Sequence, residues 1–202
     1  MPRVVNKEIK KLEILQAAMK VFAEKGIFKS RIIEIAEKAG VGKGTVYEYF
    51  RSKEEIFAAA FSLVHQNTMK AIETALHEEK DPSRQLYILV ETTIKGMLNT
   101  EDHFGELMME FWAEGVRTKD LGIMNAIDLR NLYAEYRSLI NKIIKDGIEQ
   151  KIFRELDCIN VSAVLIGAFD GLLLQWVLDP KVIDLDKVAV SLLDTFLKGI
   201  ER

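Results

Sequence analysis

The sequence lacks most of the residue groups on which disulfide scaffolds, metal sites and nucleophilic enzymes depend. Cys158 is the one cysteine, which excludes an internal disulfide and favours a role as a small buried hydrophobe. The three histidines are scattered, with no second ligand-type residue at a convincing spacing. No nucleophile–base pair, paired-carboxylate motif or cofactor loop is evident. We therefore expect no metal, no cofactor and no enzymatic activity.

Proline and strand-like patterns are also scarce. Pro2 is terminal, Pro82 is placed as the first residue of a helix, and Pro180 follows another helix. Apolar residues recur with a period of about 3.6 nearly throughout, and no stretch alternates as a strand would. The sequence thus predicts an all-α protein.

Long hydrophobic runs are limited to one segment, INVSAVLIGAFDGLLLQWVL at residues 159–178, which approaches the ~20 residues of a membrane span. Because Asp170 lies near its middle and the chain is otherwise well charged, we expect a helix buried on all sides by protein. The first residues are charged and show no secretory or lipidation signal. These features predict a cytoplasmic protein with no membrane contact.

Negative charge is in slight excess overall, at a formal −3, but it is unevenly distributed. Residues 1–57 hold 12 Lys and Arg against 8 Asp and Glu, whereas residues 58–202 hold 16 against 23. The N-terminal quarter is therefore basic by +4. A modest positive charge supports phosphate binding without proving it, because a solvated surface would look the same.

Apolar spacing and capping residues locate the helices. Gly26 is placed as the stop of the first helix and Ser30 as the N-cap of the second, while Ser52 and Glu55 form a capping box. The expected helices are residues 6–25, 31–40, 42–50, 53–79, 83–99, 102–115, 122–151, 157–178 and 184–199.

The stretch AGVGKGTVYEYF at residues 39–50 suggests either a phosphate loop or the turn of a helix-turn-helix. A phosphate loop needs Gly, four residues, then Gly-Lys-Ser/Thr. The only Gly-Lys is Gly42-Lys43, preceded at the first glycine position by Glu37 and followed by Gly44. A helical pattern also leads into the stretch where a strand is required. We therefore interpret it as two short helices joined by a glycine-containing turn.

Projection at 100° per residue divides the second of these helices into two faces. Val46 and Phe50 share the inward arc, with Lys43 and Tyr47 beside them. The outward face, which carries Gly44, Thr45, Glu48 and Tyr49, has hydroxyl groups that can bond phosphates or base edges. Glu48 either accepts a bond from a cytosine amine or points to solvent, and both interpretations remain open.

The stretch FAEKGIFKSRIIEIAEKAGVGKGTVYEYFRSKEEIF, Phe22 to Phe57, resembles the DNA-binding region of TetR-family transcriptional regulators. The resemblance implies an N-terminal three-helix helix-turn-helix domain at residues 1–53. It also implies a larger helical effector-binding and dimerisation domain at residues 54–202. One departure is Gly42, where the family often has Ser or Thr. The DNA contacts that follow from the resemblance and the outward face are Ser30, Arg31, Lys43, Gly44, Thr45, Tyr47, Tyr49 and Lys53.

The last two helices predict a homodimer, because a helix that is apolar on nearly every side needs a surface from another chain. GAFDGLLLQWVLDP, Gly167 to Pro180, resembles the family's dimerisation bundle. Two recognition helices ~34–36 Å apart would then meet successive turns of a pseudo-palindromic double-stranded DNA operator. Asp170 would bond across the dimer or to a ligand, and we favour the dimer. The expected interface residues are Val164, Ala168, Gly171, Gln175, Leu193 and Phe196.

Methionine and aromatic residues cluster at ELMMEFWAEG, residues 106–115, either as ordinary core or as the wall of an apolar pocket. The resemblance implies such a pocket, and the few obvious buried charges favour an apolar or aromatic ligand. We expect a repressor released from its operator by this small-molecule effector, although an activator, a ligand-independent DNA binder and a small helical enzyme are alternatives. The expected pocket residues are Met97, Met108, Phe111, Trp112, Tyr133, Tyr136 and Phe169.

Overall fold

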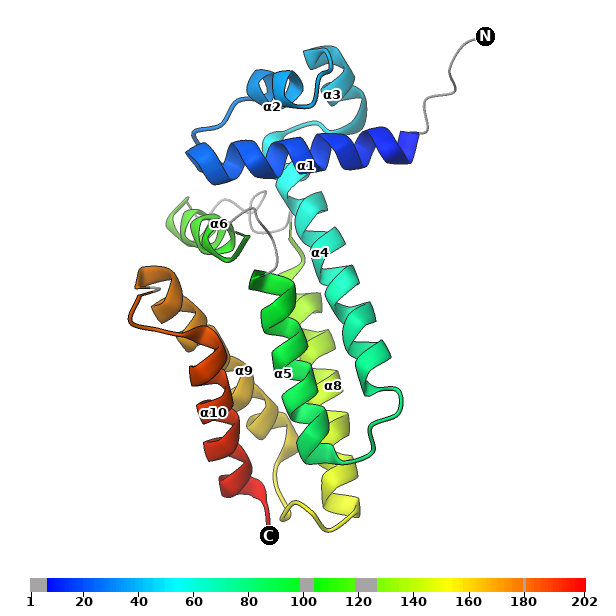
Figure 1. Cartoon of the computed structure of the whole chain (residues 1–202), viewed down its shortest axis with the longest axis vertical. Coiled ribbons are helices and arrows are strands. Elements are labelled where there is room, and N and C mark those ends of the chain that lie inside the picture. Colours follow the sequence, from blue (N-terminus) through cyan, green and yellow to red (C-terminus); the bar gives the residue numbers. More distant parts are fainter. Residues whose placement is uncertain (1–6, 99–103, 119–126, 180) are drawn as a thin grey trace. The chain divides into compact units, whose positions relative to one another are not determined.

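The computed structural model describes residues 7–98, 104–118, 127–179 and 181–202, and the side chains of Met97 and Trp112 fall outside this description. Within these ranges every regular element is a helix, which confirms the all-α prediction (Figure 1). The helices are α1 (Lys7–Lys25), α2 (Ile32–Lys38), α3 (Lys43–Tyr49), α4 (Lys53–Leu76), α5 (Pro82–Leu98), α6 (Phe104–Thr118), α8 (Leu129–Glu149), α9 (Cys158–Leu178) and α10 (Leu185–Ile200).

The chain forms two compact units. The first unit, residues 1–66 and 100–127, contains α1, α2, α3, the start of α4, and α6. The second unit, residues 67–99 and 128–202, contains the end of α4 together with α5, α8, α9 and α10. The expected boundary at residues 53/54 separates a DNA-binding domain from an effector-binding domain. The two compact units do not test this functional boundary, so it stays a prediction.

Local signals set the helix ends. Gly26 has a φ of +81° and donates its N–H to the Phe22 carbonyl at 2.7 Å, which confirms it as the stop of α1. Gly40, with a φ of +65°, makes the left-handed turn after α2. The Ser52 hydroxyl accepts the N–H of Glu55 at 3.1 Å and so caps α4. Each of these residue types is placed where its backbone or side chain satisfies a helix terminus.

The core of the first unit is built around Phe22, Val46, Phe50 and Phe57, all of which are buried. The rings of Phe22 and Phe57 meet edge to face with centroids 6.1 Å apart. These contacts join α1 to the start of α4 and anchor α3. Leu12 on the same helix is exposed, although it is apolar.

Helix α6 packs within the first unit. The ring of Phe111 stacks on Phe28 at 6.4 Å and lies 5.0 Å from the ring of Phe57. The Glu110 carboxylate accepts the backbone N–H of Ile27 at 3.2 Å, at the turn that follows α1. The methionine-rich helix is thus part of the core around α1, although the predicted division groups it with the effector-binding domain.

The second unit is a bundle in which α5 and α9 each pack against both α8 and α10 (Figure 1). Phe153, just past α8, is fully buried against Gly147 on that helix. Gly96 on α5 similarly approaches the buried Thr68 on α4. At both glycines a side chain from the neighbouring segment occupies the space that a Cβ would need.

Helix α9 is long and apolar enough to cross a membrane, and it is the one such helix among the described residues. Only 17% of its most apolar stretch is buried within the chain. The single chain therefore leaves much of α9 uncovered, and its burial by a partner stays a prediction. Ile159, Val164, Leu174 and Leu178 are exposed on this helix.

Candidate nucleic-acid interface

Helix α3 presents the predicted outward face. Val46 is fully buried and Phe50, which follows the helix, is 2% exposed, so the expected inward pair is confirmed. Gly42 is the N-cap and makes no side-chain capping bond, as its lack of a side chain requires. On the predicted outward face Glu48 is exposed and Thr45 and Tyr49 are half-buried, whereas Lys43 and Tyr47, expected beside the inward pair, are exposed.

Lys43 and Tyr47 form a joint polar surface at the start of α3. The Lys43 ammonium lies 5.7 Å from the centre of the Tyr47 ring, within cation–π range, and Tyr47 is 49% exposed. Beside them, a Cβ at Gly44 would meet no atom within 4 Å. A phosphate can therefore approach the backbone at this point while the ammonium and the phenol reach past it.

Ser30 does not cap α2, because the N-cap is Arg31. The Ser30 side chain points inward instead. It is 3% exposed and donates its hydroxyl proton to the Gly26 carbonyl at 2.6 Å. In this position it stabilises the turn after α1, and the hydroxyl is not available to a DNA phosphate.

Lys53 is similarly engaged within the fold. Its ammonium donates to the carbonyl oxygens of Phe28 and Ser30, the latter at 3.1 Å, and lies 5.8 Å from the Phe28 ring. The lysine thus holds the loop that leads into α2. The DNA contact expected for Lys53 stays a prediction, because the same ammonium group already bonds carbonyl groups of its own chain.

This competition gives a measurable prediction. We expect Lys43→Ala to reduce the slope of log affinity against log salt by about 1 on nonspecific duplex DNA, because one phosphate contact is lost. Lys53→Ala should instead lower the melting temperature and leave the slope nearly unchanged. Lys70→Ala, which removes an exposed charge in the second unit, is the control. A reduced slope with unchanged melting for Lys53→Ala would contradict the structural role.

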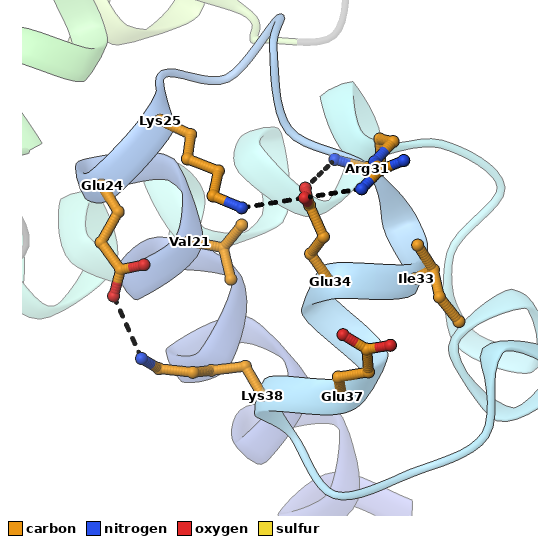
Figure 2. Close-up of a pocket in the computed structure, with 8 residues that line it drawn as sticks. All are labelled: Val21, Glu24, Lys25, Arg31, Ile33, Glu34, Glu37 and Lys38. Atoms are coloured by element: carbon orange, nitrogen blue, oxygen red, sulfur yellow. Dashed lines mark hydrogen bonds and ion pairs between the residues drawn. The ribbon is translucent and has the colours of Figure 1, made fainter.

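Arg31 offers the most accessible guanidinium at the start of α2, with its side chain 73% exposed. Glu34 accepts its backbone N–H at 2.9 Å and its guanidinium at 3.1 Å, and also binds the Lys25 ammonium at 2.8 Å. Figure 2 shows the Glu34 carboxylate between the two cations. Lys25 first, and then Arg31, lower the pKa of Glu34 to about 2, so it remains ionised at neutral pH.

A hollow of about 430 Å³ lies at this network, between α1 and α2 (Figure 2). Glu24 and Lys38 form a second ion pair across it at 3.1 Å. Because cations and carboxylates of the wall pair with each other, the hollow offers little uncompensated charge to a ligand. We interpret it as the seam that attaches α2 to α1. Its lining residues are Val21, Glu24, Lys25, Arg31, Ile33, Glu34, Glu37 and Lys38.

The sequence interpretation missed two carboxylates that organise this unit. Glu34 follows Arg31 by three residues, the spacing at which a side chain reaches back to an N-cap, so a local signal was present. Glu110 has no such signal, since its partner Ile27 lies 83 residues earlier.

The expected pocket residues are divided between the two units. Phe111 is buried among rings of the first unit and Met108 is half-buried there. In the second unit, Tyr136 and Phe169 pack against its core, and the Tyr133 hydroxyl donates to Asp170 at 3.0 Å. Phe111 is therefore a core residue, while Met97 and Trp112 lie outside the described side chains.

The expected dimer residues are mostly accessible. Val164 is 63% exposed, Gln175 is also exposed, and Ala168, Gly171 and Phe196 are half-buried. Leu193 does not fit the expected interface, because its side chain is only 2% exposed and belongs to the core of the bundle. Asp170 accepts a hydrogen bond within the chain, from the Tyr133 hydroxyl on α8.

Two family models match the chain. Residues 14–60 match the bacterial regulatory proteins of the tetR family, and residues 89–200 match the C-terminal region of the BetI-type transcriptional repressor. The first match covers the helix-turn-helix, and the second covers most of the remaining helices.

Known proteins of this kind are similar over most of their length. The uncharacterized HTH-type transcriptional regulator YvdT of Bacillus subtilis is 32% identical over 73% of this chain and 71% of its own. The fatty acid metabolism regulator protein of B. subtilis is 27% identical over 98% of both chains. The structure of the B. subtilis regulator FadR with stearoyl-CoA superposes with a TM-score of 0.79 at 24% identity, over 94% of this chain and 99% of that one. The chain belongs to the TetR family of bacterial transcriptional regulators.

Proposed function

We propose that the protein is a homodimeric repressor that binds a pseudo-palindromic DNA operator and is released from it by a small ligand. The observation that carries the proposal is the division of α3. Its inner residues Val46 and Phe50 are buried, while Lys43 and Tyr47 face outward together. A helix anchored in this way can enter a major groove without rearranging its own core.

The surface of α9 and α10 supports the dimer. Val164 and Leu174 on α9 and Val190 on α10 are large apolar side chains left exposed by the single chain. Exposed apolar surface of this kind is commonly covered by a partner. A second copy would cover the same surface on both chains, since a two-fold interface is isologous.

This arrangement also accounts for the membrane-like composition of α9. Within the second unit α9 already packs against α8 and α10, and its exposed side is interrupted by the polar Gln175. We propose that another chain covers that side, that the protein does not enter a membrane, and that it works in the cytoplasm, where its DNA lies.

A small-molecule effector fits the bundle of the second unit. FadR of B. subtilis holds stearoyl-CoA, so a related fold accommodates a ligand with a long apolar chain. Ligand binding can release DNA only if the ligand prefers one of two conformations. Helix α4, Lys53–Leu76, is a continuous element with residues in both units and would relay a displacement. We propose no catalytic role, because the relatives are transcriptional regulators.

Selection of duplexes from a random DNA library at moderate salt tests the proposal. We expect enrichment of a pseudo-palindrome. Tyr47→Ala should weaken binding to the enriched duplex by about 10- to 100-fold, in the range of a lost direct contact, and change nonspecific binding less. Glu37→Gln, at an exposed carboxylate on α2, is a control for surface change in the same unit. Absence of enrichment even at low salt would reject sequence-specific regulation.

A further inference from the structure

A carboxylate lies in the most apolar helix of the second unit. Asp170 is on α9, between Phe169 and Gly171, and is half-buried. Among the described residues, its hydrogen-bond donor is the neutral hydroxyl of Tyr133 on α8, at 3.0 Å, and it forms no ion pair. One neutral donor leaves most of the acceptor capacity of a carboxylate unused.

The charge of Asp170 is not required by the fold. Burial raises the pKa of Asp170 above its ordinary value, and the bond from Tyr133 only partly offsets this effect. An asparagine would accept the same hydroxyl proton without the cost of a buried charge. A buried carboxylate that lowers the stability of the free protein is a candidate for binding a ligand of opposite charge.

Residues near the Tyr133–Asp170 pair on α8 are less buried than those further along that helix. The bundle is tightly closed around Ile140, Ile143 and Ile144 of α8, all at most 3% exposed. In contrast, none of residues 129–139 on the same helix is buried. Phe169 and Trp176 of α9 are likewise only partly buried. Side chains are thus less buried in the N-terminal half of α8, where Tyr133 meets Asp170.

The other charged group beside this pair is Arg137, one turn along α8 from Tyr133. Its charge lowers the pKa of Tyr133, against the larger raising effects of burial and of Asp170. It makes neither a hydrogen bond nor an ion pair with Asp170 among the described contacts. The carboxylate therefore remains available to an incoming cation.

We propose that the effector is a cationic amphiphile, with an amine or quaternary ammonium group that pairs with Asp170 and an apolar body that packs against the partly buried apolar side chains of the second unit. The proposal rests on the function proposed above and names its ligand class. Tyr133 orients the carboxylate, and an anionic head group such as that of a fatty acid is repelled at the same position.

Three probes with the same chain and different head groups test the proposal: dodecyltrimethylammonium, dodecanol and dodecanoate, each below its micelle concentration. Their release of fluorescent operator DNA is followed by anisotropy, and their direct binding by the rise in melting temperature without DNA. We expect dodecyltrimethylammonium to release the operator and raise the melting temperature, with dodecanol weaker and dodecanoate inactive.

Matched variants separate the site from a general detergent effect. Asp170→Asn should require about 30-fold more dodecyltrimethylammonium, because the buried charge pair is lost. Tyr133→Phe should require an intermediate increase. Asp186→Asn, which removes an exposed charge from α10 of the same unit, should behave as the wild type. All variants should bind the operator normally before any probe is added.

The outcomes distinguish this inference from the proposed function. Equal release by dodecanoate, equal response of wild type and Asp170→Asn, or no release by any probe would each overturn the cationic ligand. Operator binding by the protein alone would still support a DNA-binding regulator in all three cases. Failure to bind an operator at all would count against the proposed function itself.

Discussion

Replacing Gly147 with alanine is expected to lower the free energy of unfolding by about 1–3 kcal/mol, the usual cost of overpacking a core. An ideal Cβ at this position would lie 2.2 Å from Cδ2 and 2.4 Å from Cε2 of Phe153. The ring is fully buried and cannot swing into solvent without opening the core. The N–H of Phe153 also donates to the Gly147 carbonyl at 3.0 Å, so backbone and ring resist displacement together.

Chemical denaturation of the purified variant measures this loss. Gly199→Ala on α10 is the matched control, because a Cβ there would meet no atom within 4 Å. The control should be neutral or slightly stabilising, since alanine is the better helix former. Equal stability of Gly147→Ala and the wild type would mean that the chain after α8 is held more loosely than the structure indicates.

Val164→Glu is expected to dissociate the dimer and to weaken operator binding by at least about 100-fold. Val164 is among the most exposed apolar side chains of α9. In a two-fold interface the substitution appears twice and places two carboxylates in an apolar contact, where each costs several times the thermal energy. A monomer would meet only one half of a pseudo-palindrome.

Sedimentation and operator titration, performed on the same preparation, check this result. Ala71→Glu adds an equal charge on the exposed surface of α4 and should leave both measurements unchanged. If Val164→Glu remains dimeric and binds the operator normally, the exposed face of α9 is not the dimer contact. A monomeric wild type that still binds a palindrome tightly would contradict the dimer altogether.

The turn and cap residues show how far the sequence is informative. Gly26 is found where the sequence predicts it, as the stop of α1. The inward pair on α3, Val46 and Phe50, also follows from helical spacing. These features depend on residues within about one helical turn of each other, so a local pattern contains the information needed to predict them.

The choice between competing hydrogen-bond partners could not be obtained in this way. Ser30 looked like an N-cap, but its hydroxyl instead bonds the carbonyl of Gly26. Lys53 looked like a phosphate contact, but the carbonyl of Phe28, 25 residues earlier, also accepts from it. In both cases two polar partners compete for one group, and the packing of the whole unit decides between them.

The sequence by itself determined that the protein is helical, that a helix-turn-helix stands near its N-terminus, and that its family is TetR. Only the tertiary structure decided that α6 packs with α1 through Glu110 and Phe111, that Leu193 is core, and that Asp170 bonds Tyr133. The physical reason is the separation along the chain of the residues that interact. Helix formation and capping follow from neighbours along the chain, whereas burial and the choice of a hydrogen-bond partner depend on which distant segments the fold brings into contact.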